Sequence, residues 1–172
     1  ALPFLAGEAK EATIWFGSLA TPGVWRATAL PAGETLAGDP LSVYADMSAV
    51  GRYVYDPNPA VVRAGLIDLL ASQKAMARLD DTEEYLTADQ LVDSAFVQPF
   101  EVLAELPNND RAIRRFFRGA NFGQVEIKCR HIPIQIETVR RKLQLDGDAA
   151  AVLIFARVAG KARALVCRDR KS

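Results

Sequence analysis

The residues best suited to hold a ligand are arginines that recur at helical spacing in the second half of the chain. Guanidinium groups three or four residues apart share one helix face, and their planar donors match the geometry of phosphate oxygens. On the opposite side of the same helix, Ile113 and Phe117 form part of an apolar stripe. The arginines that we predict to contact phosphates are Arg111, Arg114, Arg115 and Arg118.

A second basic cluster follows on the next predicted helix, and two further cations stand on the strand between the helices. Strand alternation from residue 125 to residue 130 puts the cations on the face opposite the apolar side chains. If both chain crossovers are right-handed, the two helices lie on one face of the sheet and present a joint basic surface. A solvated helix face is the alternative interpretation. These additional predicted phosphate contacts are Lys128, Arg130, Arg140, Arg141 and Lys142.

Side chains that could act as nucleophiles, bases or metal ligands are scarce. Cys129 and Cys167 have no CxxC spacing and stand in strand-like apolar runs, so we interpret both as small core residues. His131 is the single histidine, and it has no neighbouring ligands at metal spacing. We therefore predict no catalytic residue and no metal site in this chain.

A cofactor loop is also missing from the sequence. Folds that bind dinucleotides or S-adenosylmethionine need a glycine turn after their first strand, so that the backbone can approach the ligand. No two of the 11 glycines are separated by a single residue. We expect no cofactor-binding residues here, and the sequence contains neither a P-loop nor a GxSxG elbow.

The first half of the chain predicts a β-hairpin region and a connecting helix. Residues 12–19 and 24–30 are rich in β-branched and aromatic side chains, and turn residues separate them. A short strand is expected near Thr35, and another over residues 51–55. Asn58 and Pro59 are a good N-cap and first helical residue, so a helix should begin there and run to about Ser72.

The second half predicts a regular βαβαββ module. Short extended pieces over residues 76–79 and 84–87 precede it. The expected fold class is α+β, with residues 1–97 as one region and residues 98–172 as the module with a mixed sheet. Its elements are predicted at residues 100–106, 110–119, 124–130, 136–143, 150–158 and 162–168.

Charge divides the chain in two. Residues 1–107 hold 6 basic and 15 acidic residues, whereas residues 108–172 hold 15 and 6, so the zero net charge conceals halves of −9 and +9. Such asymmetry favours association of the basic half with a polyanion or with an acidic protein surface. No apolar run approaches the roughly 20 residues that cross a bilayer, so we expect no membrane contact. Two unpaired cysteines favour a reducing, cytoplasmic compartment.

Several stretches, taken in chain order, resemble a bacterial family of class I S-adenosylmethionine-dependent methyltransferases with a C-terminal THUMP-like domain. The first is similar to the late strands of the methyltransferase core, and the last two fit the family's C-terminus. The resemblance covers most of the chain in order and is therefore more specific than any single motif. The stretches are residues 7–17, 51–66, 125–128, 140–143 and 164–168.

The resemblance implies a division of labour within a larger enzyme. A Rossmann-like catalytic domain upstream in the same polypeptide would bind S-adenosylmethionine, and the THUMP-like portion would present the substrate, expected to be RNA. This chain alone is then not catalytic. The alternative is a structural module whose basic half docks on an acidic protein surface without touching nucleic acid.

Overall fold

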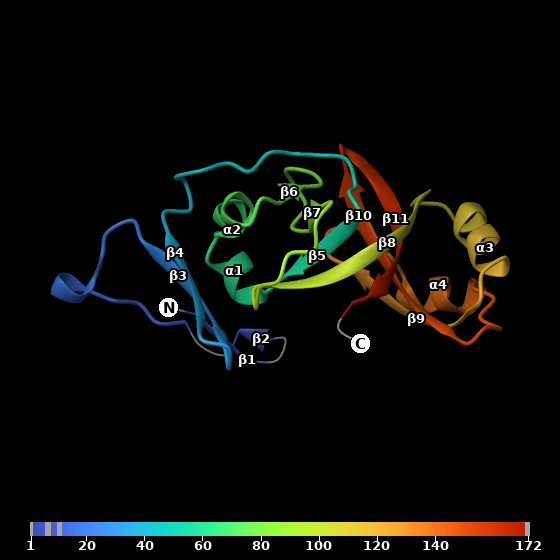
Figure 1. The fold of residues 1–172 in the computed structure, drawn as a ribbon, viewed down its shortest axis with the longest axis horizontal. Coiled ribbons are helices and arrows are strands. Elements are labelled where there is room, and N and C mark those ends of the chain that lie inside the picture. The colour runs from blue at the N-terminus through green and yellow to red at the C-terminus, as the bar shows by residue number, and fades with distance from the viewer. Residues whose placement is uncertain (1, 6–7, 10–11, 171–172) are drawn as a thin grey trace.

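A curved mixed sheet of seven strands organises most of the molecule (Figure 1). The computed structural model describes residues 2–5, 8–9 and 12–170. The strand order is β6-β7-β5-β8-β11-β10-β9, in which β9 and β10 run parallel and the other neighbours antiparallel. This arrangement, with helices beside a mixed sheet, confirms the predicted α+β class.

The second half of the chain follows its hydrophobic pattern closely. Along β10, Val152 and Ile154 enter one apolar cluster while Leu153 and Phe155 enter another, so this strand is buried on both faces. The predicted boundary after residue 97 falls at the start of β8, which pairs with β5 on one side and β11 on the other. The elements are β8 (Val97–Pro107), α3 (Asp110–Arg118), β9 (Phe122–Cys129), α4 (Ile136–Lys142), β10 (Ala149–Val158) and β11 (Lys161–Asp169).

The first half contains a small second sheet and two short helices. The Asn58 side chain accepts a hydrogen bond of 2.8 Å from the Ala60 amide, which confirms the predicted helix cap. Gly65, at φ +68°, ends the first turn of helix and divides the predicted long helix into two. The elements are β1 (Leu2–Leu5), β2 (Glu8–Ala9), η1 (Gly17–Leu19), β3 (Trp25–Leu30), β4 (Glu34–Gly38), β5 (Tyr53–Pro57), α1 (Pro59–Arg63), α2 (Ile67–Gln73), β6 (Ala77–Arg78) and β7 (Leu86–Ala88).

The predicted hairpin between residues 12–19 and 24–30 is wrong. Both edges of β3 are occupied, by β4 in an antiparallel pair and by β1 in a parallel pair. β3 therefore offers no free edge to residues 12–16, and the chain forms the short 3-10 helix η1 after them. The hairpin of this region is β3–β4, so the expected strand near Thr35 is confirmed while its partner differs.

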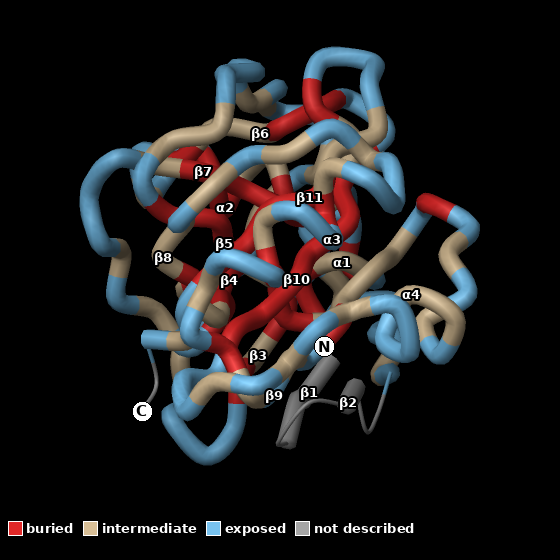
Figure 2. The backbone as a smooth tube through the Cα atoms, turned by 90° about the vertical axis from the view of Figure 1, so that its right-hand side faces the viewer, coloured by how far each residue is buried: buried red, intermediate tan, exposed pale blue. Residues whose placement is uncertain are grey.

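Burial is concentrated in the centre of the large sheet (Figure 2). One apolar cluster lies between the small sheet and α1 and α2, one lies inside the curve of the large sheet, and one lies beneath α3 and α4. None of the helices formed by the described residues has the length and apolar character that crossing a bilayer requires.

Replacing Ala75 by glycine is expected to raise the free energy of unfolding by about 0.5 to 1 kcal/mol. Ala75 follows α2 at φ 53°, and the next amide, from Met76, donates to the Ala71 carbonyl at 2.9 Å. A residue with a Cβ is strained in this left-handed cap, and glycine is not. Urea unfolding measures the gain. Ala20→Gly, at φ −87°, is the control and should not stabilise; an equal gain there would contradict the explanation.

Candidate nucleic-acid interface

Helix α3 is built to present arginines to solvent. The Asn109 side chain caps its first turn by accepting from the Ala112 amide at 2.8 Å. Ile113 and Phe117 are buried against the sheet and fix the rotation of the helix. The predicted arginines consequently all lie on the exposed side: Arg111, Arg114, Arg115 and Arg118.

Helix α4 lies beside α3 over the same apolar cluster, so both helices cover one face of the sheet. Lys142 of α4 forms an ion pair with Asp110 in the first turn of α3. The hydrogen bond from Lys142 lowers the pKa of the Asp110 carboxyl, and the charge of Arg114 lowers it further. Arg140 and Arg141 remain exposed on α4. We call the four α3 arginines together with Arg140 and Arg141 the basic face.

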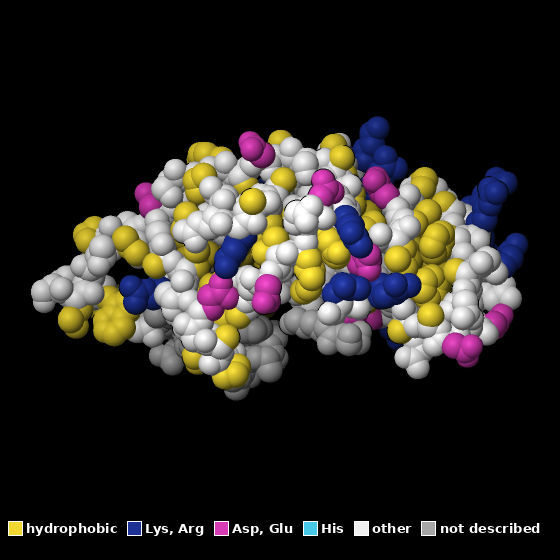
Figure 3. Space-filling model, viewed as in Figure 1, with side chains coloured by type: hydrophobic (Ala, Val, Ile, Leu, Met, Phe, Trp, Pro, Cys, Tyr) yellow, Lys and Arg dark blue, Asp and Glu magenta, His cyan; other side chains and the backbone are white. Residues whose placement is uncertain are grey.

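Within the described part of the chain, the α3 arginines have no ion-pair partner. Among the described residues, no carboxylate lies within 4.0 Å of a nitrogen of Arg111, Arg114, Arg115 or Arg118. Arg140 lies 3.6 Å from Glu137, in a pair whose side chains are 47% and 77% exposed. Lysine and arginine side chains project from the end of the molecule that α3 occupies (Figure 3). Positive charge on this face is therefore available to an external anion.

Lys128 and Arg130 lie elsewhere, on the other side of β9. Lys128 Nζ is 3.5 Å from Asp56 Oδ2 and 3.2 Å from Glu126 Oε1. Arg130 Nη2 lies 2.6 Å from Asp56 Oδ1, and its other terminal nitrogen pairs with Glu84. Carboxylates within the molecule, Asp56, Glu84 and Glu126, already lie beside these two cations, and their contact with RNA phosphates stays a prediction.

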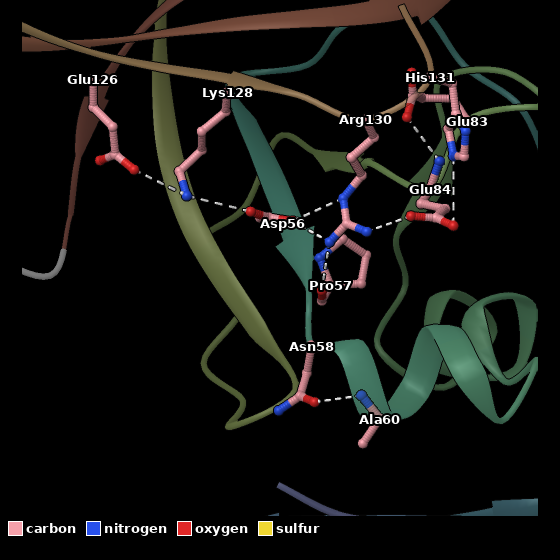
Figure 4. Close-up of polar contacts among 10 residues, drawn as sticks. All are labelled: Asp56, Pro57, Asn58, Ala60, Glu83, Glu84, Glu126, Lys128, Arg130 and His131. Carbon is pink, nitrogen blue, oxygen red and sulfur yellow. Dashed lines mark hydrogen bonds and ion pairs between the residues drawn. The ribbon is translucent and has the colours of Figure 1, made fainter. Parts of the chain in front are cut away.

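Arg130 is the centre of this ion network (Figure 4). Its guanidinium also donates to the Pro57 carbonyl at 3.0 Å and lies 5.6 Å from the centre of the Tyr85 ring. Burial opposes the charged form of Arg130, but the charge of Asp56 and the hydrogen bond to it raise the pKa above its usual value. Burial, followed by the charge of Asp56, raises the pKa of Tyr85.

The network shows that the large sheet curls. β9 and β5 are separated by β10, β11 and β8 in the strand order, yet Lys128 and Arg130 contact Asp56. The apolar cluster inside the curve lies between them. Sequence reasoning missed Asp56 and Glu84 as partners, because they lie 74 and 46 residues from Arg130 along the chain. The cations on the polar face of β9 were the sequence feature that could have indicated carboxylate partners.

Neither cysteine has the surroundings of a nucleophile. Burial raises the pKa of Cys167 to about 12, so its thiol stays protonated. Cys129 packs against the cluster beneath α3 and α4. His131 Nε2 lies 3.5 Å from Glu84 Oε1 at the end of β9, where it is half exposed. Both cysteines therefore lie in apolar surroundings, as expected of small core residues.

Asp80 is expected to make stability depend on pH. Its carboxylate accepts hydrogen bonds from the Thr82 hydroxyl at 2.7 Å and from the Gly160 amide at 2.6 Å. The bond from Thr82 outweighs the opposing effect of burial and lowers the pKa to about 2. A lowered folded-state pKa stabilises the fold above the unfolded pKa of about 4, and this contribution is lost as the pH falls toward 2.

The test is Asp80→Asn, which replaces an acceptor by an amide that cannot serve both donors. Its free energy of unfolding should fall by about 1 to 2 kcal/mol near pH 7 and match the wild type near pH 2. Urea unfolding at both pH values measures this. Exposed Asp93→Asn is the control. A deficit for Asp80→Asn that persists unchanged at low pH would contradict the assignment.

Comparison with known proteins identifies a family match and relatives of this chain. Residues 97–169 match the THUMP domain-like family. Over 170 residues, the chain is 31% identical to a protein named uncharacterized S-adenosylmethionine-dependent methyltransferase in Mycobacterium tuberculosis strains CDC 1551 and H37Rv. This match covers 96% of the chain and 47% of the relative, so the chain spans about half the length of the curated relatives it matches.

A solved structure shows the same fold. A protein described as a "putative methyltransferase" from Porphyromonas gingivalis W83 superposes with a TM-score of 0.62 at 18% identity. The superposition covers 80% of this chain and 35% of that protein. The chain is therefore homologous to proteins named as S-adenosylmethionine-dependent methyltransferases, and its residues 97–169 form a THUMP-like domain.

Proposed function

We propose that this chain is the RNA-binding portion of an S-adenosylmethionine-dependent methyltransferase, in which the basic face holds phosphates of the substrate. Catalysis then belongs to the part of the polypeptide that the relatives have and this chain does not span. The chain positions RNA for that part and transfers no methyl group itself.

The observation that carries the proposal is the contrast between two sets of cations. Lys128 and Arg130 are matched by Asp56 and Glu84 inside the molecule. The α3 arginines are exposed and have no such partners in the described part of the chain. Because an uncompensated cluster of guanidinium groups attracts polyanions strongly, a phosphate backbone is the ligand that fits it best.

The names of the relatives are the one reason to propose S-adenosylmethionine as the cofactor of the larger enzyme. The sequence has no glycine pair at the spacing of a cofactor loop, and the basic face offers arginines rather than a cradle of backbone amides. The residues present here do not fit this cofactor. We place its binding site in the remaining half of the enzyme.

A structural docking module is the second candidate, and one observation favours it. Several cations of the basic half already pair with carboxylates of the acidic half, including Arg163 with Glu105 at 3.0 Å and Arg170 with Glu101 at 3.5 Å. In this case the basic face would contact an acidic protein surface instead of RNA. Raising the salt concentration would then loosen a contact between protein regions.

Titration of the chain with a fluorescently labelled structured RNA at several salt concentrations tests the proposal. We expect binding whose log K falls linearly with log salt, with a slope of about 0.7 to 0.9 per phosphate contacted. A neutral polymer of similar size is the control ligand. Absence of binding even at low salt would overturn the RNA proposal for this chain and favour the docking module.

A further inference from the structure

The small sheet β2-β1-β3-β4 is covered on one face only. Ala27, Ala29 and Leu36 point from β3 and β4 into the cluster beneath α1, and α1 contacts β1, β2 and β3. The opposite face bears the exposed pair of hydroxyls from Thr28 and Thr35, 3.2 Å apart, and no described element packs on it. Parallel strand pairs such as β1 and β3 are normally buried on both sides.

The connection between β1 and β3 is unusual for a parallel pair. Such a crossover generally packs a helix onto the sheet. Here residues 12–25, which we call the apolar arm, lead into β3 through the short turn η1 at one end of the molecule (Figure 1). The apolar arm contains no Asp, Glu, Lys or Arg.

Large apolar side chains cover the arm and are exposed to solvent. Their relative exposure ranges from 43% to 78%, and hydrophobic side chains are visible at this end of the molecule (Figure 3). Several large exposed apolar side chains on one short segment are typical of an interaction site. The residues are Ile14, Trp15, Phe16, Leu19, Val24 and Trp25.

We infer that the apolar arm and the uncovered face of the small sheet are the docking surface for the remaining half of the methyltransferase polypeptide. The chain spans 47% of its curated relatives and 35% of the structural relative, so these proteins contain a further body large enough to cover the sheet. Because the arm has no charges, it lacks the cation cluster that phosphates of RNA or anionic lipids require.

The docking surface rests on the proposed function in one respect, since both require a larger enzyme. The apolar arm and the basic face are nevertheless separate surfaces. The sequence has two tryptophans, Trp15 and Trp25, and both lie on the apolar arm. Tryptophan fluorescence therefore reports on this surface directly. In the chain alone, we expect acrylamide to quench both residues freely and sedimentation to show a monomer at all concentrations.

Hydrogen exchange tests whether the remaining half of the polypeptide covers the apolar arm. Amides of the apolar arm in this chain should exchange at least about tenfold faster than those of the aligned segment in the full-length Mycobacterium tuberculosis relative. Helix α3 is the internal control, because its exchange should be alike in both proteins. Equally fast exchange of the two segments overturns the inference.

Two other results would also overturn it. A concentration-dependent dimer that protects the tryptophans, and that Trp15→Ser with Trp25→Ser abolishes, assigns the arm to a second copy. A shift of tryptophan emission on adding the structured RNA or anionic vesicles assigns it to those ligands. Loss of RNA binding through the basic face alone leaves the docking result unaffected, so failures of the two proposals can be distinguished.

Discussion

Replacing Arg114 and Arg115 by glutamate is expected to raise the Kd for a structured RNA by roughly 100-fold at physiological salt. Both side chains are exposed on α3, and the substitution removes two phosphate-binding groups and adds two repulsive charges. The salt slope should also fall by about 0.7 to 0.9 for each phosphate that is no longer bound. Fluorescence anisotropy across a salt series measures both quantities, and circular dichroism verifies that the helix is retained.

A charge-matched variant separates a local effect from a general effect of net charge. Arg26→Glu with Arg63→Glu changes the net charge equally, and both residues are exposed outside α3 and α4. We expect this variant to bind RNA with less than about a threefold loss of affinity. Equal weakening by both double variants would mean that the long-range field, rather than the basic face, determines affinity.

Much of the second half could be predicted because residues within or beside each element indicate where it begins and ends and which face it buries. Asn109 and Gly119 bound α3, and the alternation along β9 separates Ile127 from Lys128. The apolar run over residues 150–158 predicts a strand, and the structure places β10 there, buried on both faces. Asn58 and Pro59 likewise start α1 through a local hydrogen bond.

The remaining features depend on interactions between distant segments. Arg130 meets Asp56 across 74 residues of sequence, and only the curl of the sheet brings them together. The same curl pairs two cations of the predicted phosphate-binding set with Asp56. Residues 12–16 have strand-forming composition, but the strand that they would join is already paired on both edges. Local patterns contain no information about which strand edges remain free.

The two proposed surfaces lie at opposite ends of the long axis of the molecule (Figure 1). The apolar arm projects at one end, and α3 with its arginines forms the other. A catalytic domain docked on the arm is therefore remote from phosphates held at α3. If both proposals hold, an RNA substrate would extend along the molecule to meet both surfaces, and a folded RNA would fit them better than a mononucleotide.

The Asp56–Arg130 pair is expected to stabilise the fold far more than an exposed pair does. Its side chains are 18% and 23% exposed, and Arg130 also donates to Glu84 and to the Pro57 carbonyl. Arg130→Met leaves two nearby carboxylates without their main partner, so the free energy of unfolding should fall by about 3 kcal/mol. Urea unfolding measures this decrease.

A double-mutant cycle of Asp56→Asn and Arg130→Met isolates the interaction, with an expected coupling of about 1.5 to 3 kcal/mol. The exposed pair of Glu137 and Arg140 is the matched control, because solvent and salt screen it, and its cycle should give no more than about 0.5 kcal/mol. A coupling for Asp56 and Arg130 as small as the control would mean that the curl is maintained by the apolar cluster alone. A large coupling means that ion pairs join the acidic first half to the THUMP-like domain. The cations of β9 are engaged in these pairs, whereas the cations of α3 stay available to an external anion.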